Sequence, residues 1–318
     1  MCIICTKKYN QNITYLNCRS CQNITTIPND LYNLKYLNIS NTNITYISAF
    51  YKNLIYLNIN NTKITKIYNY INLKKLLCKN SLITNIPYDL TNLEYLNCSF
   101  TNIKQLPNSL LNLKYLSCYN TEIKRLSKKY IKLLLLKCYN TNIYYIPKDY
   151  TNLIYLDAHN TYIKYLSYKL NDILYLNISN TLITKITLTN IIYLNISNTK
   201  INKLNTNLSE LSTLICYNSN INHIPIELYN IHTIYPKCLN KININKYIDI
   251  IDFNNLSKYK NLEINKNVCC AICLDSIYNQ VNIIYIKSCK HIFHSDCILN
   301  WYKIKLDCPC CRKKLFEY

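Results

Sequence analysis

The 318-residue sequence contains no glycine, only one methionine and one tryptophan, and no long hydrophobic run. Its first ten residues include Lys7 and Lys8 but lack the apolar stretch of a secretory signal peptide. No window approaches the roughly 18 consecutive apolar residues that indicate a membrane-spanning helix. These absences favour an intracellular protein with no membrane partner. The hydrophobic fraction of 49% is globular and argues against disorder throughout the chain.

Acidic residues are also scarce, with 16 Asp and Glu against 37 Lys and Arg, which leaves a net charge of +21. Such a balance can indicate a nucleic acid or another anionic partner. The basic residues are spread singly, however, and the longest runs are pairs such as Lys128 and Lys129. Because no concentrated phosphate-binding patch is visible, we expect no nucleic-acid partner.

The residues in excess are Asn, Ile, Lys and Leu, whose codons are rich in A and T, together with 33 Tyr. Part of the Asn and Lys content therefore reflects an A/T-rich genome, and a single Asn or Lys carries little weight. The 18 Cys residues are numerous for an intracellular protein. In a reducing compartment they favour metal ligands and buried thiols over disulfides.

A repeat of about 20 residues fills the first two-thirds of the chain. Its unit is Leu-Lys-Tyr-Leu-Asn-Ile-Ser-Asn-Thr-Asn-Ile at 34–44, and it recurs at 54–64, 73–83, 93–103, 113–123, 133–143, 153–163, 173–183, 191–201 and 211–221. An irregular first copy lies at 13–27. The order of apolar positions resembles leucine-rich repeats, with Thr or Ser where Asn or Cys is usual. A hydroxyl at that place can still satisfy backbone groups of the turn.

Each unit predicts a short strand, a turn and a second apolar corner such as Ile86-Pro87, and no unit can bury its apolar face alone. The resemblance implies an α/β-type leucine-rich-repeat solenoid of about eleven repeats over residues 1–236, with short parallel strands on the concave side and a mostly irregular or short-helical convex side. Where the periodicity fades, residues 237–266 are expected to cap the solenoid and link it to a domain at 267–318. A short helix is expected from Ile248 to Leu256.

Five cysteines, Cys18, Cys98, Cys118, Cys138 and Cys216, stand at an inward strand position that Ile39 or Ile178 takes in other repeats. We expect them to be small buried hydrophobic side chains without a redox or metal role.

Alternation along a strand predicts which residues face outward on the concave side. One outward column is mostly tyrosine, and the next is mostly asparagine. Such a surface suits protein recognition, because Tyr offers a large area and a polar tip. The substrate-binding candidates are Tyr95, Tyr115, Tyr155, Tyr175 and His159. Copying of an A/T-rich repeat explains these columns equally well, so departures from them are better specificity candidates, namely Lys75, Leu135, Lys137 and His159.

Eight Cys and His residues near the C-terminus carry the strongest chemical signal. They are Cys270, Cys273, Cys289, His291, His294, Cys297, Cys308 and Cys311, separated in turn by 2, 15, 1, 2, 2, 10 and 2 residues. Thiolate and imidazole are the ligands of closed tetrahedral zinc sites, and eight of them fill two sites with no open position. Two structural zinc ions are therefore expected, and they stabilise a segment too short for a sufficient core.

This pattern resembles the RING finger with His at the fourth and fifth ligand places, over roughly the last fifty residues. A PHD finger would have Cys where His291 stands. The resemblance implies cross-braced ligation, in which one zinc is held by Cys270, Cys273, His294 and Cys297, and the other by Cys289, His291, Cys308 and Cys311. Shifting the register to the adjacent Cys269 or Cys310 breaks the two-residue gaps, so neither is expected to be a ligand.

The resemblance also implies a groove for a ubiquitin-conjugating enzyme, formed by Ile272, Trp301 and Pro309. Arg312 matches the cationic residue that contacts both the conjugating enzyme and ubiquitin, and its planar donor fork suits this bridging role. Trp301 in the core of a small domain and Arg312 as an ordinary surface residue are the alternatives. The implied activity is that of a RING-type ubiquitin-protein transferase with no covalent intermediate on this chain, acting through positioning.

The solenoid would then present a protein substrate to the ubiquitin-loaded enzyme. A non-catalytic scaffold whose RING only mediates assembly is the competing class, and a nucleic-acid-binding zinc protein would need a basic stripe that is absent. The pairing of domains and the composition resemble leucine-rich-repeat RING proteins of giant DNA viruses. For a viral protein the expected location is the host cytoplasm.

Overall fold

The structure is a computed structural model that describes residues 3–6, 9–221, 228, 231, 233–234, 248–251, 268–273, 275–277, 283–286, 289–294, 297–298, 301 and 308–312. The chain divides into two compact units, Met1–Cys238 and Leu239–Tyr318. Within the described ranges, no helix has the length and apolar character needed to cross a bilayer.

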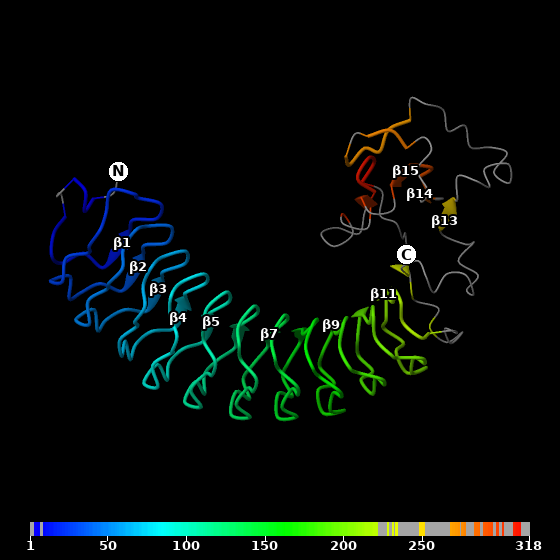
Figure 1. The fold of residues 1–318 in the computed structure, drawn as a ribbon, viewed down its shortest axis with the longest axis horizontal. Coiled ribbons are helices and arrows are strands. Elements are labelled where there is room, and N and C mark those ends of the chain that lie inside the picture. Colours follow the sequence, from blue (N-terminus) through cyan, green and yellow to red (C-terminus); the bar gives the residue numbers. More distant parts are fainter. Residues whose placement is uncertain are drawn as a thin grey trace. The chain divides into compact units, whose positions relative to one another are not determined.

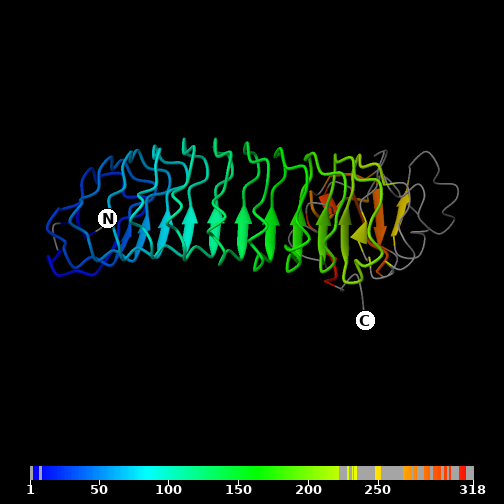
Figure 2. The ribbon, with the colours of Figure 1, turned by 90° about the horizontal axis from the view of Figure 1, so that it is seen from below.

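The first unit is a solenoid built on one parallel sheet of twelve very short strands in sequential order. Figure 1 shows it as an arc with the strands along its inner, concave side, and Figure 2 shows neighbouring strands pointing the same way. The strands are β1 (Tyr15–Asn17), β2 (Tyr36–Asn38), β3 (Tyr56–Asn58), β4 (Lys75–Leu77), β5 (Tyr95–Asn97), β6 (Tyr115–Ser117), β7 (Leu135–Lys137), β8 (Tyr155–Asp157), β9 (Tyr175–Asn177), β10 (Tyr193–Asn195), β11 (Thr213–Ile215) and β12 (Thr233–Ile234). The predicted solenoid fold is confirmed.

The register follows the repeat, because Leu at the centre of one strand pairs with Leu at the centre of the next, as Leu37 does with Leu57. These leucines and the inward Ile two residues later are fully buried, as at Leu57 and Ile59. Burying such a side chain stabilises the fold by about 1.5–3 kcal/mol. Residues 9–221 form no helix, so the convex side consists of turns and irregular segments.

A left-handed residue follows each strand of the solenoid up to β11. Asn takes this place in nine repeats, with φ between 51° and 57°, whereas Ser20 and Phe100 take it in two others. Glycine normally fills such positions because a Cβ clashes there, and Asn is the residue that tolerates them next best. The abundant Asn therefore has a structural use in a chain without glycine.

The hydroxyl that replaces Asn or Cys in the repeat has the role expected of it. Thr141 Oγ1 donates to the Cys138 carbonyl at 2.6 Å, and Ser81 Oγ donates to the Cys78 carbonyl at 2.7 Å. The same bond closes the corresponding turn in the other regular repeats. These hydroxyl groups supply hydrogen bonds to carbonyl groups in the turn that follows each short strand.

The asparagine column of the concave face serves the fold more than recognition. Asn38 Oδ1 accepts hydrogen bonds from the backbone N–H and the Oγ–H of Ser40, and Asn177 does the same with Ser179. Asn58, Asn97 and Asn195 bind the N–H two residues on in the same way. These Asn side chains are therefore engaged in the turns of the fold, and the expected recognition surface stays a prediction.

The inward cysteine column is longer than expected, because Cys78 joins Cys98, Cys118 and Cys138 in consecutive repeats. All four are fully buried, and Cys18 is 1% exposed. Burial raises the pKa of Cys98 to about 12, so these thiols are protonated at neutral pH. Cys216 departs from the expected thiol: it is disulfide-bonded, to a partner outside the described residues.

The second unit contains one antiparallel sheet, with β14 (Ile283–Ile286) between β13 (Ile248–Ile251) and β15 (Ile292–His294). The short helix expected from residue 248 is therefore wrong at 248–251, and the rest of that span lies outside the described residues. Three of these four residues are Ile, and β-branched residues favour strands. The strand pairs with the equally Ile-rich β14, so this segment extends the sheet of the second unit.

Candidate metal centres and concave face

Two groups of four Cys and His residues meet in the second unit. One group is Cys270, Cys273, His294 and Cys297, and the other is Cys289, His291, Cys308 and Cys311; within each, one atom per residue lies within 4.8 Å of the others. The groups alternate along the chain, since each takes two ligands before the other takes its next two. Cys269 and Cys310 are exposed and belong to neither group.

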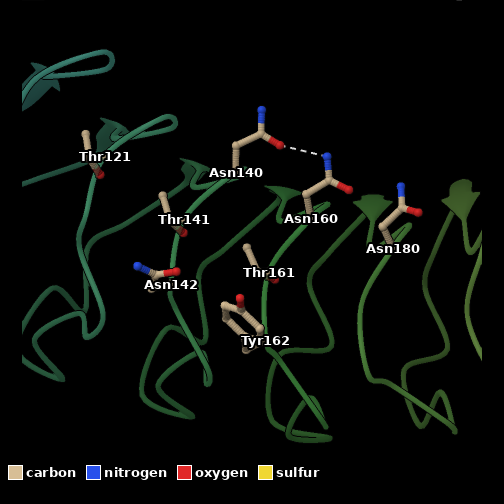
Figure 3. Close-up of a pocket in the computed structure, with 8 residues that line it drawn as sticks. All are labelled: Thr121, Asn140, Thr141, Asn142, Asn160, Thr161, Tyr162 and Asn180. Atoms are coloured by element: carbon tan, nitrogen blue, oxygen red, sulfur yellow. Dashed lines mark hydrogen bonds between the residues drawn. The ribbon is translucent and has the colours of Figure 1, made fainter.

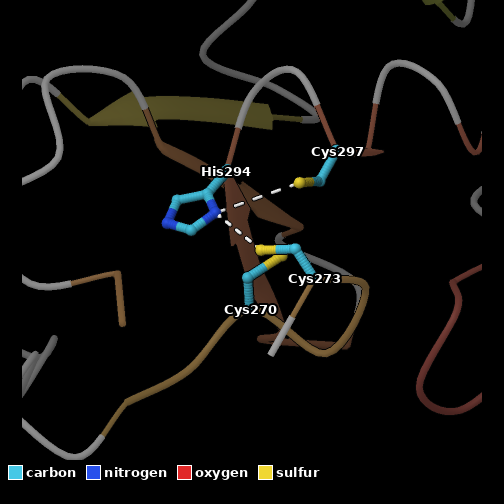
Figure 4. Close-up of side chains that lie close together, drawn as sticks. All are labelled: Cys270, Cys273, His294 and Cys297. Atoms are coloured by element: carbon cyan, nitrogen blue, oxygen red, sulfur yellow. Dashed lines mark hydrogen bonds between the residues drawn. The ribbon is translucent and has the colours of Figure 1, made fainter. Parts of the chain in front are cut away.

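The first group is arranged around His294 Nδ1, which lies 3.2 Å from Cys273 Sγ and 3.9 Å from Cys297 Sγ (Figure 4). The other ring nitrogen, Nε2, lies 3.2 Å from the Ser276 carbonyl oxygen and can donate to it. This contact leaves the Nδ1 lone pair directed at the sulfur atoms, and metal-binding histidines typically donate their other ring N–H to a carbonyl in this way. In the second group, His291 Nδ1 lies 3.4 Å from Cys308 Sγ.

Local structure explains how these ligands converge. Cys270 and Cys273 lie in a tight turn that is closed by the Cys270 N–H to Asp275 carbonyl bond of 2.9 Å. Cys289 and His291 lie in the connection between β14 and β15, where Lys290 has a φ of 61°. His294 ends β15 behind the fully buried Phe293. These five ligands thus come from two tight turns and a strand end, whereas Cys308 and Cys311 lie in a further turn.

Each group offers three sulfur atoms and one imidazole nitrogen, a donor set that fits a closed tetrahedral zinc site. Burial raises the pKa of Cys289 and of Cys297 to about 12. A metal must therefore displace thiol protons at neutral pH, which makes its affinity pH-dependent.

The residues expected to contact a conjugating enzyme lie in or next to these ligand segments. Ile272 stands between the first two ligands and is half-buried, as are Trp301 and Pro309, whereas Arg312 is exposed. The Arg312 N–H donates to the Cys308 carbonyl at 2.8 Å, and its φ is 55°. The backbone of Arg312 is thus held by the last ligand loop while its side chain is available to solvent.

Residues 268–312 match the family model of the ring finger domain. Over this RING finger the chain is 38% identical across 63 residues to the transmembrane E3 ubiquitin-protein ligase FLY2 of Arabidopsis thaliana, covering 19% of this chain and 11% of the relative. It is 39% identical across 46 residues to the E3 ubiquitin-protein ligase RING1-like of the same plant, covering 14% of each. Across 46 residues it is 41% identical to its RING-H2 finger protein ATL28, covering 14% of this chain and 18% of the relative. The chain thus spans less than a fifth of each relative.

Solved structures match the solenoid instead. The functional domain of InlJ from Listeria monocytogenes, which includes a cysteine ladder, matches with a TM-score of 0.68 and 23% identity over 73% of this chain and 55% of that one. The leucine-rich-repeat protein LIC12759 of Leptospira interrogans matches with a TM-score of 0.62 and 21% identity over 73% and 71%. These likenesses establish the leucine-rich-repeat fold of the first unit.

The tyrosine column of the concave face forms stacks. Ring centroids lie 4.1 Å apart between Tyr155 and Tyr175 and 4.3 Å apart between Tyr175 and Tyr193, with the rings nearly parallel. Tyr95 and Tyr115 form a looser pair at 5.7 Å. Because neighbouring rings cover each other's faces, the column presents ring edges and hydroxyl groups. Its tyrosines therefore suit hydrogen bonding and edge contacts with a protein better than stacking with nucleobases.

His159 belongs to a second stack and to a polar contact on strand β8. Its ring lies 4.3 Å from that of Tyr139, and its Nδ1 lies 2.7 Å from Asp157 Oδ1. Nearby, Lys137 Nζ lies 5.4 Å from the centre of the Tyr155 ring. Three of the residues that depart from the regular columns, Leu135, Lys137 and His159, thus fall on the adjacent strand regions of β7 and β8.

A row of aliphatic side chains, which the sequence analysis missed, borders the same strands. It consists of Leu134, Ile154, Leu174 and Ile192, each one residue before its strand, and three of them are 39–43% exposed. Their backbones are hydrogen-bonded in succession, so the side chains are neighbours. The three repeats directly before this row place charged Lys74, Glu94 and Lys114 at the same position, and the repeat before them places Ile55 there. The change from charged to apolar residues is a signal that an alignment of the repeats against one another reveals.

A shallow groove along the turns is lined by Thr121, Asn140, Thr141, Asn142, Asn160, Thr161, Tyr162 and Asn180 (Figure 3). Its polar groups are largely engaged within the fold: Asn160 Nδ2 donates to Asn140 Oδ1 at 2.7 Å, and Thr161 Oγ1 donates to the Ala158 carbonyl. We therefore assign no ligand to this groove.

Proposed function

We propose that the chain is a RING-type ubiquitin ligase, in which the RING finger binds a ubiquitin-conjugating enzyme and the concave face binds a protein substrate. The observation that carries the proposal is the pair of four-ligand groups with Ile272, Trp301, Pro309 and Arg312 in or beside their loops. The relatives that are named as ligases match over this same segment.

Both groups would hold zinc, which would supply about 10–16 kcal/mol of folding free energy per structural site. Each ion would have four protein ligands, so its role is to shape the loops that carry the contact residues. Ile272, Trp301 and Pro309 then present apolar surface to the conjugating enzyme. Half-buried aromatic and aliphatic anchors of this kind dominate the affinity of protein interfaces.

In the proposed reaction, the amine of a substrate lysine attacks the carbonyl carbon of the ubiquitin thioester on the conjugating enzyme. A C–N bond forms, the C–S bond breaks, the enzyme's thiolate leaves, and the amine loses a proton. This chain would supply no nucleophile. The Arg312 guanidinium would donate to acceptors on both the enzyme and ubiquitin and restrain the thioester, and such positioning accelerates the attack by lowering its entropic cost.

The substrate would bind over β7–β10. There the aliphatic row adjoins the stacked Tyr155, Tyr175 and Tyr193, and Lys137 and His159 add charge and polarity. An apolar centre with aromatic neighbours and a polar rim is typical of protein interfaces. We therefore propose this part of the concave face, more than the regular columns as a whole, as the substrate site.

The test is an autoubiquitination assay with a panel of conjugating enzymes, in which wild type is compared with Trp301→Ala and Arg312→Ala. Arg125→Ala, an exposed solenoid arginine, is the matched control. We expect conjugates with wild type and the control, and strong loss with the two RING variants while their zinc content stays at the wild-type level. If zinc-loaded wild type is inactive with every enzyme, the ligase proposal fails and a scaffold role takes its place.

A further inference from the structure

The convex segments of the solenoid change character along its length. Each follows the buried Ile of a turn on the outer side of the arc (Figure 1), and its first, second, fifth and sixth places are exposed in most repeats. In 84–89 and 104–109 these places hold one basic and one acidic residue in total, whereas in 124–129, 144–149 and 164–169 they hold seven basic residues and one acidic residue. Copying of one repeat unit would give the same residues in each segment, so the basic excess is a feature of these three repeats.

Backbone contacts place equivalent residues of these repeats side by side. The Tyr162 N–H donates to the Ile143 carbonyl at 2.9 Å, and the Tyr150 hydroxyl donates to the Ser127 carbonyl at 2.8 Å. Lys128, Lys148 and Tyr168 hold the same place in three successive repeats and therefore form one column. Because about 20 residues separate its members along the chain, the sequence shows only scattered lysines where the fold gathers them.

We call Lys128, Lys148, Lys164, Lys169, Tyr165 and Tyr168 the basic aromatic face. Its four lysines are exposed, and none forms an ion pair with a carboxylate of the described residues. Glu122, which precedes the face, is paired with Lys104 instead, at 3.5 Å between Oε2 and Nζ. A group of cations without compensating acids creates a positive potential that attracts an anionic partner.

The two tyrosines of this face differ from those of the concave side. Tyr165 and Tyr168 are 66% and 70% exposed, and within the described part of the chain neither ring contacts another ring or a cation. On the concave side, by contrast, Tyr155 and Tyr175 cover each other at 4.1 Å. Even Tyr144 of the preceding repeat is covered, since the Arg125 guanidinium carbon lies 5.5 Å from the centre of its ring. Tyr165 and Tyr168 therefore offer free ring faces on which a planar group can stack.

Exposed rings among unpaired cations fit a partner that carries negative charges and planar rings together. Single-stranded nucleic acid has both, because its phosphates are anionic and its bases have unstacked faces. In a duplex the bases are already stacked on one another, and an acidic protein segment supplies the charge without the regularly spaced rings. We propose that the basic aromatic face binds single-stranded nucleic acid, with phosphates beside the four lysines and bases stacked on Tyr165 and Tyr168. This second binding site departs from the expectation drawn from the scattered lysines, and it does not depend on ligase activity.

The test is the binding of a fluorescein-labelled oligouridylate to the full-length chain, followed by fluorescence anisotropy at a series of salt concentrations. We expect Tyr165→Ala and Tyr168→Ala each to weaken binding by about fivefold or more, because each removes a stacking platform. Lys148→Ala/Lys164→Ala should lower the slope of log affinity against log salt by about 1.4, since each phosphate contact on a single strand contributes about 0.7.

The matched control is Tyr46→Ala/Tyr88→Ala. Tyr46 and Tyr88 hold the places of Tyr165 and Tyr168 in earlier repeats and are exposed by 49% and 66%, but the segment of Tyr88 contains no basic residue. The control should bind as wild type does, and all variants should keep the wild-type urea midpoint, which separates loss of the site from loss of the fold.

Absence of binding at physiological salt would overturn the proposal, and so would equal losses in the control and in the Tyr165 and Tyr168 variants. Polyglutamate serves as a competitor that has charge but no rings. If it displaces the oligouridylate efficiently and the two tyrosine variants bind as wild type does, an acidic protein segment takes the place of nucleic acid as the partner.

Discussion

At the scale of the residue, the absence of glycine makes asparagine the main left-handed residue of the solenoid. Asn160 has a φ of 53°, and its side chain donates to Asn140 in the preceding repeat. Phe100 adopts the same backbone conformation at φ 55°, where a non-Gly, non-Asn residue is strained by roughly 1–2 kcal/mol. Substitution should therefore destabilise the solenoid at Asn160 and can stabilise it at Phe100.

We predict that Asn160→Ala lowers the free energy of unfolding of the solenoid by about 1–2 kcal/mol, through the left-handed strain and the lost hydrogen bond. Asn160→Gly keeps the left-handed backbone conformation accessible. It should therefore destabilise the solenoid less than Asn160→Ala does, by about 0.5 kcal/mol or more. Phe100→Asn should raise the free energy by about 1 kcal/mol. Urea unfolding measures all three. Equal effects of Ala and Gly at position 160 would contradict the strain argument.

Some of these roles could be predicted from the sequence pattern, and others could not. The hydroxyl at Thr141 could be predicted because its place in the repeat is a known turn position. The tasks of Asn38 and Asn160 could not, since a nucleotide-composition bias explains an excess of Asn just as well. Position in a repeat tells which way a side chain points, whereas its hydrogen-bond partner depends on backbone angles that the pattern does not contain.

At the scale of the element, the buried thiol column links the stability of the solenoid to pH. Burial raises the pKa of Cys98 from 9.0 to about 12, and it raises those of Cys78 and Cys118 well above 9.0. The folded state therefore holds these protons at a pH where the unfolded chain releases them. Stability contributed in this way is complete below about pH 9 and is lost as the pH rises toward the folded pKa.

We predict that the free energy of unfolding of the solenoid falls between pH 9 and pH 12, by about 1.4 kcal/mol per pH unit for each thiol involved. Urea unfolding at a series of pH values measures the slope. Cys98→Ala should reduce the slope by the contribution of one thiol. A slope that is unchanged by this substitution would show that the Cys98 thiol does not cause the pH dependence. Substitution of the exposed Cys310 by Ala should leave it unaffected.

Elements were predictable where one physical rule acts in every copy. The strands of the solenoid and the inward Leu and Ile follow from a period of about 20 residues and from alternation. The segment at 248–251 has no such repetition, and whether it forms a helix or a strand depends on pairing with β14, which lies 35 residues later. The aliphatic row likewise belongs to no single repeat, because each repeat contributes only one of its side chains.

At the scale of the whole molecule, the two units should respond differently to metal removal. The proposed RING zinc ions supply folding free energy directly, whereas each solenoid repeat is stabilised by its neighbours. We predict that chelation abolishes amide hydrogen-exchange protection over 268–312 and preserves it over β3–β10. Loss of protection along the entire solenoid would show that the two units unfold as one.

The proposed division of labour between the units also predicts variants that separate two kinds of ubiquitination. Ile154→Asp places a charge in the aliphatic row but leaves the RING intact, so autoubiquitination should continue while ubiquitination of substrates is lost. Ile55→Asp is the matched control, because Ile55 holds the same position in an earlier repeat between Lys35 and Lys74 and is similarly exposed, at 40% against 43%.

The measurement is quantitative proteomics of ubiquitin-modified peptides from cells that express wild type, Trp301→Ala, Ile154→Asp or Ile55→Asp. Sites that disappear with Trp301→Ala define the ligase-dependent set. That set should also disappear with Ile154→Asp and persist with Ile55→Asp. An empty set would count against ligase activity itself. An aspartate buried in a protein interface costs far more binding free energy than an exposed one, so Ile154→Asp must weaken any substrate that binds over β7–β10. A set of sites that survives Ile154→Asp would therefore place the substrate site elsewhere and leave the ligase proposal standing.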